Sequence, residues 1–366
     1  MDVGVITFHS AHNYGASLQT WALQKVLKNL GTNPCVIHYH PDIIDRLYVA
    51  PRQDTLKKKI KFLAKKKYRD RVKMQVYKNK KYVHFIRHNF KLLGDFKSYE
   101  ELKNANLGLD AYITGSDQVW NSDHTDGFDP AYLLDFAEAG AKKISYAASV
   151  GREYILPQYR EQFAESLKTY TSISVREASA RPAIEALTDK PVEVVLDPTL
   201  LLDRKDYEEL KKPGLFHGRY ILVYMMETNS DLVKFANKLS VAMGIPIIQR
   251  KPPTVFRNEL GSYYTDTAAE FLSEIENAEY VLTNSFHATV FSLIYEKPFI
   301  SMLHTSTGAR TSDLLKSVGL ESHIVYQTED FHDIHQFDID DKEELRRRIK
   351  ELQKTSYDFL HRALGV

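Results

Sequence analysis

A histidine and an arginine in this sequence each follow an apolar segment and have the chemistry to act on an anionic substrate. His287 lies in "TNSFHATVFSLIY", where Thr283, Asn284 and Ser285 lead from an expected strand into an apolar helix. A helix N-terminus attracts anions, and an imidazole exchanges a proton near neutral pH. Arg176, in "SISVREASA", offers a planar fork for a carboxylate or phosphate. Together these residues suit a small substrate that carries two or three negative charges.

Two loops nearer the start of the chain carry further polar side chains. In "HSAHNYGAS", Asn13 and Gly15 suit a tight turn, and we expect Ser17 to cap the helix that follows. The second loop is "GSDQVWN", whose candidate site residues are Gly115, Ser116, Asp117 and Gln118. Ligands of open α/β sheets bind beyond the carboxyl ends of the strands, which is where both loops are expected.

Each of these residues also has a purely structural interpretation. Asn13, Ser116 and Ser285 are typical helix caps, and Asp117 also suits a helix start. Arg176 next to an acidic residue is typical of a surface ion pair, and His287 could be a buried neutral side chain.

A pair of histidines suggests a metal only weakly. His38 and His40 share one face of an expected strand, with Asp42 nearby. The sequence shows no third ligand for them, so we expect no metal.

Composition indicates an ordinary globular chain. The 366 residues carry a formal net charge of +1 and 43% hydrophobic residues, so no global charge favours nucleic acid as a partner. The single cysteine, Cys35, cannot form an intramolecular disulfide. We expect a cytoplasmic protein, because strand-like sequence from Val3 leaves no space for a secretion signal. The apolar runs are also shorter than the roughly 18 residues of a membrane span.

The order of the expected elements predicts two domains. Short β-branched runs alternate with helical patterns along the chain, and this alternation is typical of parallel sheets. Prolines and charged residues cluster near 198–215. We therefore expect residues 1–200 and 201–340 to form two sheets with a cleft between them, the usual position of a ligand site. Residues 341–366 are expected to form a helix that packs back on the first domain.

A strongly basic segment lies within the first domain. Between Lys57 and Lys81 thirteen residues are Lys or Arg and only Asp70 is acidic, with apolar residues interspersed. This pattern predicts a basic amphipathic helix or helical hairpin, in an insertion at about 52–92. It is either a solvated face or a surface that contacts an anionic membrane or a phosphorylated acceptor.

Six segments taken in order resemble the polysaccharide pyruvyl transferase family. They are "HNYGASLQTWAL", "ITGSDQVWN", "YAASVG", "ISVRE", "VLDPTLLL" and "TNSFHATVFSLIYEKPFIS", and the likeness covers roughly residues 3–320. The resemblance implies a glycosyltransferase-B-like α/β architecture, with two Rossmann-like domains that face a cleft. It also implies transfer of a pyruvyl group from phosphoenolpyruvate to a sugar of a cell-surface glycan or lipid-linked precursor, as a ketal. Phosphoenolpyruvate is then a substrate, and no cofactor is implied.

The resemblance also implies roles for individual residues. By position, His287 resembles the active-site histidine of the family and Arg176 a phosphoenolpyruvate-binding arginine. Some members carry an arginine where this chain has Ser285, and we expect Arg310 or Arg152 to supply that charge from another loop.

The chemistry assigns the remaining residues. Transfer requires an acid that protonates the donor methylene and a base near the sugar hydroxyl. We expect His287 to be the acid and Asp117 the base, while Arg176, Asn284 and Ser285 hold the carboxylate and phosphate. Asn13 and the Gly15 backbone are expected to face the acceptor, and the helix end at Ser17 to face an anion.

Two other functions fit the same pattern. A nucleotide-sugar glycosyltransferase would use the same two-domain scaffold, with a carboxylate such as Glu227 on the ribose hydroxyls. A glycan-binding protein without catalytic activity would keep only the cleft.

Overall fold

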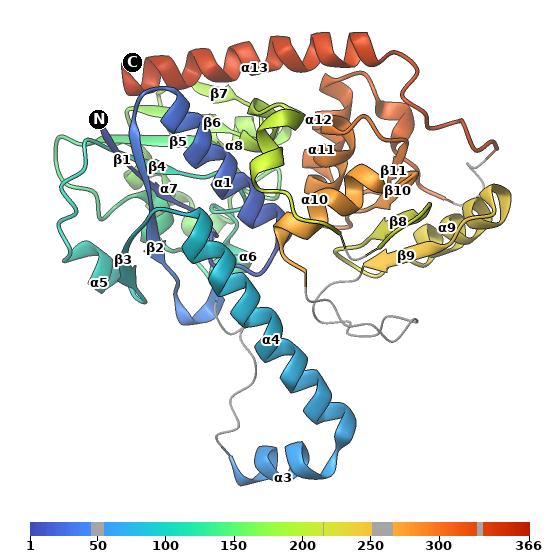
Figure 1. The fold of residues 1–366 in the computed structure, drawn as a ribbon. Coiled ribbons are helices and arrows are strands. Elements are labelled where there is room, and N and C mark those ends of the chain that lie inside the picture. Colours follow the sequence, from blue (N-terminus) through green and yellow to red (C-terminus); the bar gives the residue numbers. More distant parts are fainter. Residues whose placement is uncertain (45–54, 215, 251–265, 328–331) are drawn as a thin grey trace.

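The computed structural model describes residues 1–44, 55–214, 216–250, 266–327 and 332–366. These residues form two parallel sheets, with helices packed on their faces (Figure 1). The protein is therefore an α/β protein with two Rossmann-like domains that face a cleft, the glycosyltransferase-B-like architecture expected from the sequence.

The first sheet has seven parallel strands in the order β3-β2-β1-β4-β5-β6-β7. The strands are β1 (Asp2–Ile6), β2 (Asn33–Tyr39), β3 (Leu92–Phe96), β4 (Ala111–Thr114), β5 (Lys142–Ala148), β6 (Ser172–Val175) and β7 (Val192–Val194). The central strands are buried on both faces, which explains their nearly continuous apolar sequences. The sequence analysis did not predict β3, whose "LLGDF" contains a glycine and an exposed acid.

Along the chain, the helices of this domain alternate with its strands. The α-helices are α1 (Tyr14–Asn29), α3 (Leu56–Ala64), α4 (Lys66–Asn89), α5 (Tyr99–Lys103), α6 (Ser122–Thr125), α7 (Arg160–Leu167) and α8 (Arg181–Glu185). Shorter 3-10 turns are η1 (Pro130–Leu133), η2 (Pro157–Tyr159), η3 (Ala178–Ala180), η4 (Pro198–Leu201) and η5 (Arg204–Glu209).

The first helix corrects one expectation. Its cap is Asn13, whose side-chain oxygen accepts hydrogen bonds from the backbone N–H groups of Gly15 and Ala16. Ser17 was expected to be the cap, but it lies one turn inside the helix and is fully buried. Asn13 holds the extended backbone that a cap requires, so the chain enters the helix four residues earlier.

The second sheet has four parallel strands in the order β11-β10-β8-β9. The strands are β8 (Ile221–Tyr224), β9 (Ile247–Arg250), β10 (Tyr280–Thr283) and β11 (Phe299–Ser301). The helices are α9 (Ser230–Met243), α10 (Ala268–Asn277), α11 (Phe286–Ile294), α12 (Ala309–Ser317) and α13 (Lys342–Leu364), with a 3-10 turn η6 (Glu321–His323).

The two domains share one continuous hydrophobic core. Tyr14 of α1 stacks on Phe271 of α10 at a ring-centroid distance of 4.5 Å, and Tyr207 of η5 lies 5.1 Å from Phe291 of α11. The long α13 then runs from the second domain back over the first, as Figure 1 shows. Its side chains reach the first domain, since Ser356 Oγ accepts a hydrogen bond from the backbone N–H of Leu196. Direct packing of this kind holds loops of both domains in a fixed relation.

The basic segment forms a helical hairpin that projects away from both sheets (Figure 1). The helices α3 and α4 meet at Lys65, whose extended backbone separates them. The base of the hairpin packs on the body: Tyr82 is fully buried and stacks on His12 at 4.8 Å. Residues 52–54 of the expected insertion lie outside the described residues.

Candidate active site

A pocket opens between the two domains. It encloses about 130 Å³ and is lined from the first domain by Phe8, Ala11, Asn13, Ala16, Ile44, Asp117, Gln118 and His124. The second domain contributes Met226, Ser285, Phe286, His287 and Arg310. Five of the residues predicted from the sequence to contact substrate therefore line this pocket. Arg310, which was expected to supply a positive charge from another loop, lines it as well.

The N-termini of two helices meet at this pocket, one from each domain. Asn13 caps α1, and Ser285 caps α11 by accepting a hydrogen bond from the backbone N–H of Ala288 at 3.4 Å. Both caps line the pocket, together with Ala16 in the first turn of α1 and Phe286 and His287 in the first turn of α11. The first N–H groups of a helix carry partial positive charge, so the two ends together favour a bound anion.

A buried carboxylate, that of Asp197, links the two domains behind the pocket. It accepts hydrogen bonds from Arg176 Nη1 at 2.8 Å and Ser116 Oγ at 3.0 Å, and its other oxygen accepts from Thr199. His287 Nε2 lies 3.5 Å from Asp197 Oδ2. Burial opposes ionisation, but the charges of His287 and Arg176 outweigh it and hold the pKa of Asp197 far below its usual range.

Arg176 lies behind the pocket wall instead of lining it. Its side chain is 2% exposed and faces three carboxylates: Asp197 at 2.8 Å, and Asp117 and Glu177 at 3.8 Å each. Burial alone would lower the pKa of Arg176, but these carboxylates overcome it and raise the pKa. Its Nε and Nη2 make no hydrogen bond within the described residues. The surface ion pair with Glu177 is excluded, because both side chains are buried.

His287 is a pocket residue held between the domains. It is 8% exposed, and Nε2 faces Asp197. Its other nitrogen lies against Gly15: a β-carbon built on Gly15 would stand 2.1 Å from His287 Nδ1. Gly15, the second residue of α1, therefore provides the space that the imidazole occupies.

Arg310 is the guanidinium that lines the pocket. It is the second residue of α12, and its guanidinium carbon lies 5.6 Å from the centre of the Phe286 ring, which Arg176 also approaches, at 4.5 Å. Burial, followed by the charge of Arg176, lowers the pKa of Arg310 to about 10. Among protein groups it donates one long hydrogen bond, to Thr307 Oγ1 at 3.3 Å, and its Nε has no hydrogen-bond partner in the described residues. A site of this kind gains free energy when an anion arrives.

The loop after β4 divides its residues between the pocket and the protein interior. Asp117 and Gln118 line the pocket, whereas Ser116 is fully buried on Asp197. Gly115 has φ +110° and lies so close to Tyr146 that a β-carbon would stand 2.2 Å from its carbonyl oxygen. Gly115 thus serves backbone packing, which in turn places Asp117 at the pocket.

Three predicted site residues lie elsewhere. Arg152 pairs with Asp123 and does not line the pocket. The Asn284 amide accepts a hydrogen bond from the Met226 backbone N–H at 2.7 Å and donates one to the carbonyl oxygen of residue 227 at 2.9 Å, so it holds the loop after β8. Ser17 is enclosed within the first domain.

The sequence analysis missed Asp197, His124 and Phe286 as site residues. Asp197 was visible in "VLDPTLLL", where an acid ends an apolar run at the carboxyl end of a strand. His124 lines the pocket on the short α6, and burial, the larger cause, lowers its pKa. No spacing rule joins His124 to the other residues, because only the fold brings α6 next to α11.

A sequence profile of the polysaccharide pyruvyl transferase family matches residues 13–306. The chain therefore belongs to the polysaccharide pyruvyl transferase family, and its membership supports a transferase. The matched segment contains every pocket residue except Phe8, Ala11 and Arg310. A search of curated proteins finds no match.

Solved structures similar to this chain are distant in sequence. A putative UDP-N-acetylglucosamine 2-epimerase from Listeria monocytogenes has 12% identity and a TM-score of 0.49, over 98% of this chain and 90% of that one. The Methanocaldococcus jannaschii UDP-GlcNAc 2-epimerase, solved with UDP-GlcNAc and UDP, has 12% identity and a TM-score of 0.44, over 97% and 100%. Os79 from O. sativa, solved with UDP and deoxynivalenol-3-glucoside, has 11% identity and a TM-score of 0.44, over the whole of both chains.

Proposed function

We propose that this protein transfers a pyruvyl group from phosphoenolpyruvate to two hydroxyls of a sugar, in a glycan or lipid-linked precursor. The observation that carries the proposal is the convergence of two helix N-termini, Arg310 and His287 on one interdomain pocket, in a chain of the pyruvyl transferase family. Each of these groups favours negative charge, and the imidazole adds a transferable proton.

The reaction needs one proton and loses one phosphate. Protonation of C3 of phosphoenolpyruvate creates a cationic centre at C2, to which a sugar hydroxyl adds as it loses its proton to a base. A second hydroxyl of the same sugar then replaces the phosphate, and its proton leaves with the inorganic phosphate. Two hydroxyls and one phosphoenolpyruvate thus give one ketal and one phosphate.

We assign the acid to His287 and the base to Asp117, which face the same pocket from different domains. Asp197 holds the imidazole in place from behind, since its carboxylate lies 3.5 Å from Nε2. Asp117 also supplies a counter-charge for the cationic centre at C2.

The charges around the pocket decide how an anionic donor would be held. Arg176 is already opposed by three carboxylates, so its charge is largely compensated. The donor would therefore depend on Arg310, the two helix N-termini and protonated His287.

Two features favour this donor over a nucleotide sugar. An enclosed volume of about 130 Å³ is close to the roughly 150 Å³ of an engineered cavity that holds benzene, so it suits a three-carbon donor. Glu227, the candidate ribose ligand, instead accepts hydrogen bonds from the Thr305 backbone N–H at 2.7 Å and Thr305 Oγ1 at 2.8 Å.

Mass spectrometry tests the reaction directly. The protein is incubated with phosphoenolpyruvate and a panel of sugars and lipid-linked sugars, and we expect one product heavier by a pyruvyl ketal together with free phosphate. The variant H287Q should make neither at a measurable rate while its melting temperature stays within a few degrees. Phosphate release by H287Q at the wild-type rate would refute the acid assignment.

Ligand-induced stabilisation tests the donor independently of the acceptor. We expect phosphoenolpyruvate to raise the melting temperature and UDP-sugars to leave it unchanged. Stabilisation by a nucleotide sugar alone would favour a glycosyltransferase, and no response to any donor would favour a glycan-binding protein.

We also propose that the protein works in the cytoplasm, with the α3–α4 hairpin on the inner face of the membrane. No helix in the described parts of the chain is long and apolar enough to span a membrane. On α3, Leu56, Ile60 and Leu63 are 74%, 56% and 74% exposed and follow one another at helical spacing. Lysines surround this apolar stripe, and each contributes roughly 1 kcal/mol near an anionic surface.

Vesicle sedimentation tests the membrane contact. We expect the protein to bind vesicles that contain phosphatidylserine more tightly than vesicles of phosphatidylcholine, and to lose binding as salt rises. The double variant I60D/L63D should abolish binding, whereas V241D, at an equally exposed position of α9, should not. Equal losses in both variants would contradict a specific role of the hairpin.

A further inference from the structure

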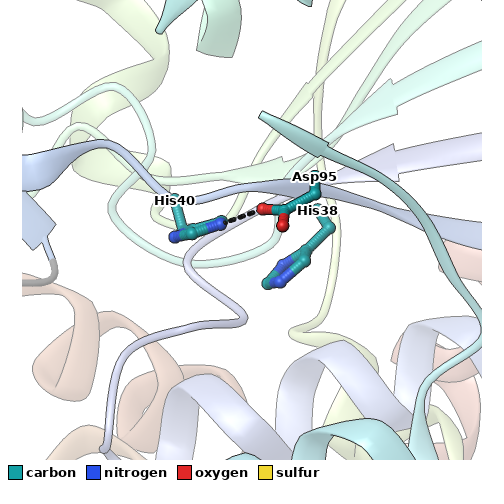
Figure 2. A group of neighbouring side chains, drawn as sticks. All are labelled: His38, His40 and Asp95. Atoms are coloured by element: carbon teal, nitrogen blue, oxygen red, sulfur yellow. Dashed lines mark hydrogen bonds and ion pairs between the residues drawn. The ribbon is translucent and has the colours of Figure 1, made fainter. Parts of the chain in front are cut away.

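Three side chains that can each offer a ligand atom to a metal ion meet at one edge of the first sheet, outside the pocket described above. They are His38 on β2, His40 just after β2, and Asp95 on the neighbouring β3 (Figure 2). One ligand atom from each lies within 4.8 Å of the others. Asp95 is 55 residues from His40 in the sequence, so the third ligand that the sequence analysis did not find is supplied by strand pairing.

A bulge between the two strands aligns the three side chains. Ile37 pairs with Leu93, but Tyr39 pairs with Phe96, so β3 holds one more residue than β2 in this interval. Without the extra residue, Asp95 would be in register with Tyr39 and would face the opposite side of the sheet. Gly94 makes the bulge feasible because it takes φ +71°. The bulge in β3 therefore places the Asp95 carboxylate on the same side of the sheet as His38 and His40.

A chain of hydrogen bonds fixes which nitrogen of His38 carries a proton. His9 is fully buried, and its Nδ1 lies 3.1 Å from the carbonyl oxygen of Thr7, which can only accept. His9 Nδ1 is therefore the donor, and in the neutral ring its Nε2 accepts. That nitrogen lies 2.8 Å from His38 Nδ1, which must donate. The lone pair of His38 is then on Nε2, and a histidine oriented through its other nitrogen is typical of metal ligands.

We propose that His38, His40 and Asp95 form a binding site for a divalent transition-metal ion, with Zn²⁺ as the type ion. Two imidazoles and one carboxylate are a ligand set that Zn²⁺ accepts, at about 2.0–2.1 Å from nitrogen and 2.0–2.2 Å from oxygen. Asp95 is 69% exposed, so water has access to the fourth position. Binding requires the proton shared by His40 Nε2 and Asp95 Oδ1, now 2.6 Å apart, to leave and the side chains to move apart slightly.

The position of the site connects it with the pocket loop. His9, which orients His38, lies in the same loop as Phe8, Ala11 and Asn13, and these three line the pocket. A bound ion would brace β2, β3 and this loop together. It would act as a structural ion with one open position, and no part of the proposal depends on the transferase reaction.

Calorimetric titration of the untagged, metal-free protein with Zn²⁺ tests the site, and Co²⁺ absorption spectra report the ligands. We expect one equivalent to bind and to raise the melting temperature. D95N should weaken binding at least tenfold, although its amide oxygen can still accept the hydrogen bond from His40, and H40Q should abolish the one-equivalent phase. Because Asp95 is exposed, D95N should fold normally.

The chain provides a matched control in the double variant H84Q/H88Q. His84 and His88 are exposed, lie one turn apart on α4 and stack at 5.9 Å, so they are a second surface histidine pair. We expect this variant to bind Zn²⁺ as the wild type does. Binding that is lost in H84Q/H88Q but unchanged in D95N, or no binding of one equivalent to the wild type, would overturn the proposal. His40 and Asp95 would then form an ordinary hydrogen-bonded ion pair.

Discussion

At the scale of single residues, the site depends on a carboxylate that does not touch the pocket. The Asp197 carboxylate accepts hydrogen bonds from Arg176 and Ser116 of the first domain, and His287 of the second domain lies next to it. This arrangement changes what Arg176 is expected to do. An R176A variant would remove the guanidinium that faces Asp197, Asp117 and Glu177, and loss of one partner of a buried ion pair costs about 3–5 kcal/mol. We therefore expect R176A to lose stability first, and not donor affinity alone as the sequence suggested.

Arg310 leads to a prediction in the opposite direction. Burial and the charge of Arg176 lower its pKa to about 10, which means that the guanidinium, although charged at neutral pH, is less stable in the folded protein than in water. We expect R310M to raise the melting temperature by a few degrees, because it removes this cost. The same variant should lose the stabilisation by phosphoenolpyruvate in a thermal-shift titration.

Arg152 is the matched control for that experiment. Its guanidinium pairs with Asp123 away from the pocket, so R152M should keep the response to phosphoenolpyruvate. If R310M responds normally to phosphoenolpyruvate and R152M does not, Arg310 is not the donor-binding cation.

At the scale of elements, two helix starts and one glycine define the geometry. The caps Asn13 and Ser285 place the ends of α1 and α11 at the same pocket, and Gly15 lets the two ends approach. A serine or asparagine at a strand-to-helix turn satisfies exposed N–H groups, so capping and anion binding are served by the same residue type. For Asn13 and Ser285, the structural and the functional interpretations therefore hold together.

The variant G15A tests this contact. Alanine is the better helix former by up to about 1 kcal/mol, so the stability of the first domain should change little. Its β-carbon would stand 2.1 Å from His287 Nδ1, so the imidazole must move, and we expect turnover to fall at least tenfold. Kinetic assays of G15A, H287Q and the double variant measure the coupling. A wild-type rate in G15A would show that the imidazole has space to adjust.

At the scale of the whole molecule, one ionised group connects the domains and predicts their response to acid. The pKa of Asp197 is held below its unfolded value of about 3.9, so its contribution to stability is complete above that pH. The contribution is lost as the pH falls below about 4, because the unfolded chain then binds a proton that the folded chain resists.

Denaturant unfolding from neutral pH to about pH 3 measures this effect. The wild type should lose stability below pH 4, and D197N, which has no group to protonate there, should show a shallower loss from a lower starting stability. Parallel pH curves for the two proteins would indicate that other carboxylates govern acid unfolding.

Much of this protein could be predicted from its sequence. Alternating apolar runs and helical patterns determine two parallel sheets, because burial on both faces of a strand imposes continuous apolar residues. The loops that line the pocket were also visible, since ligands of open α/β sheets bind beyond the carboxyl ends of the strands and these loops carry polar residues there. His287, Asp117, Ser285 and Asn13 were found in this way.

Only the tertiary structure decided which side chains share a neighbour. It placed Arg176 behind the wall and Arg310 in front of it, made Asp197 the link between domains, and brought Asp95 to His38 and His40 through a bulge. These relations join residues that are far apart in the chain, and a periodic pattern describes only near neighbours. Charge compensation, burial and strand register are properties of the packed molecule, so they could not be predicted from the sequence alone.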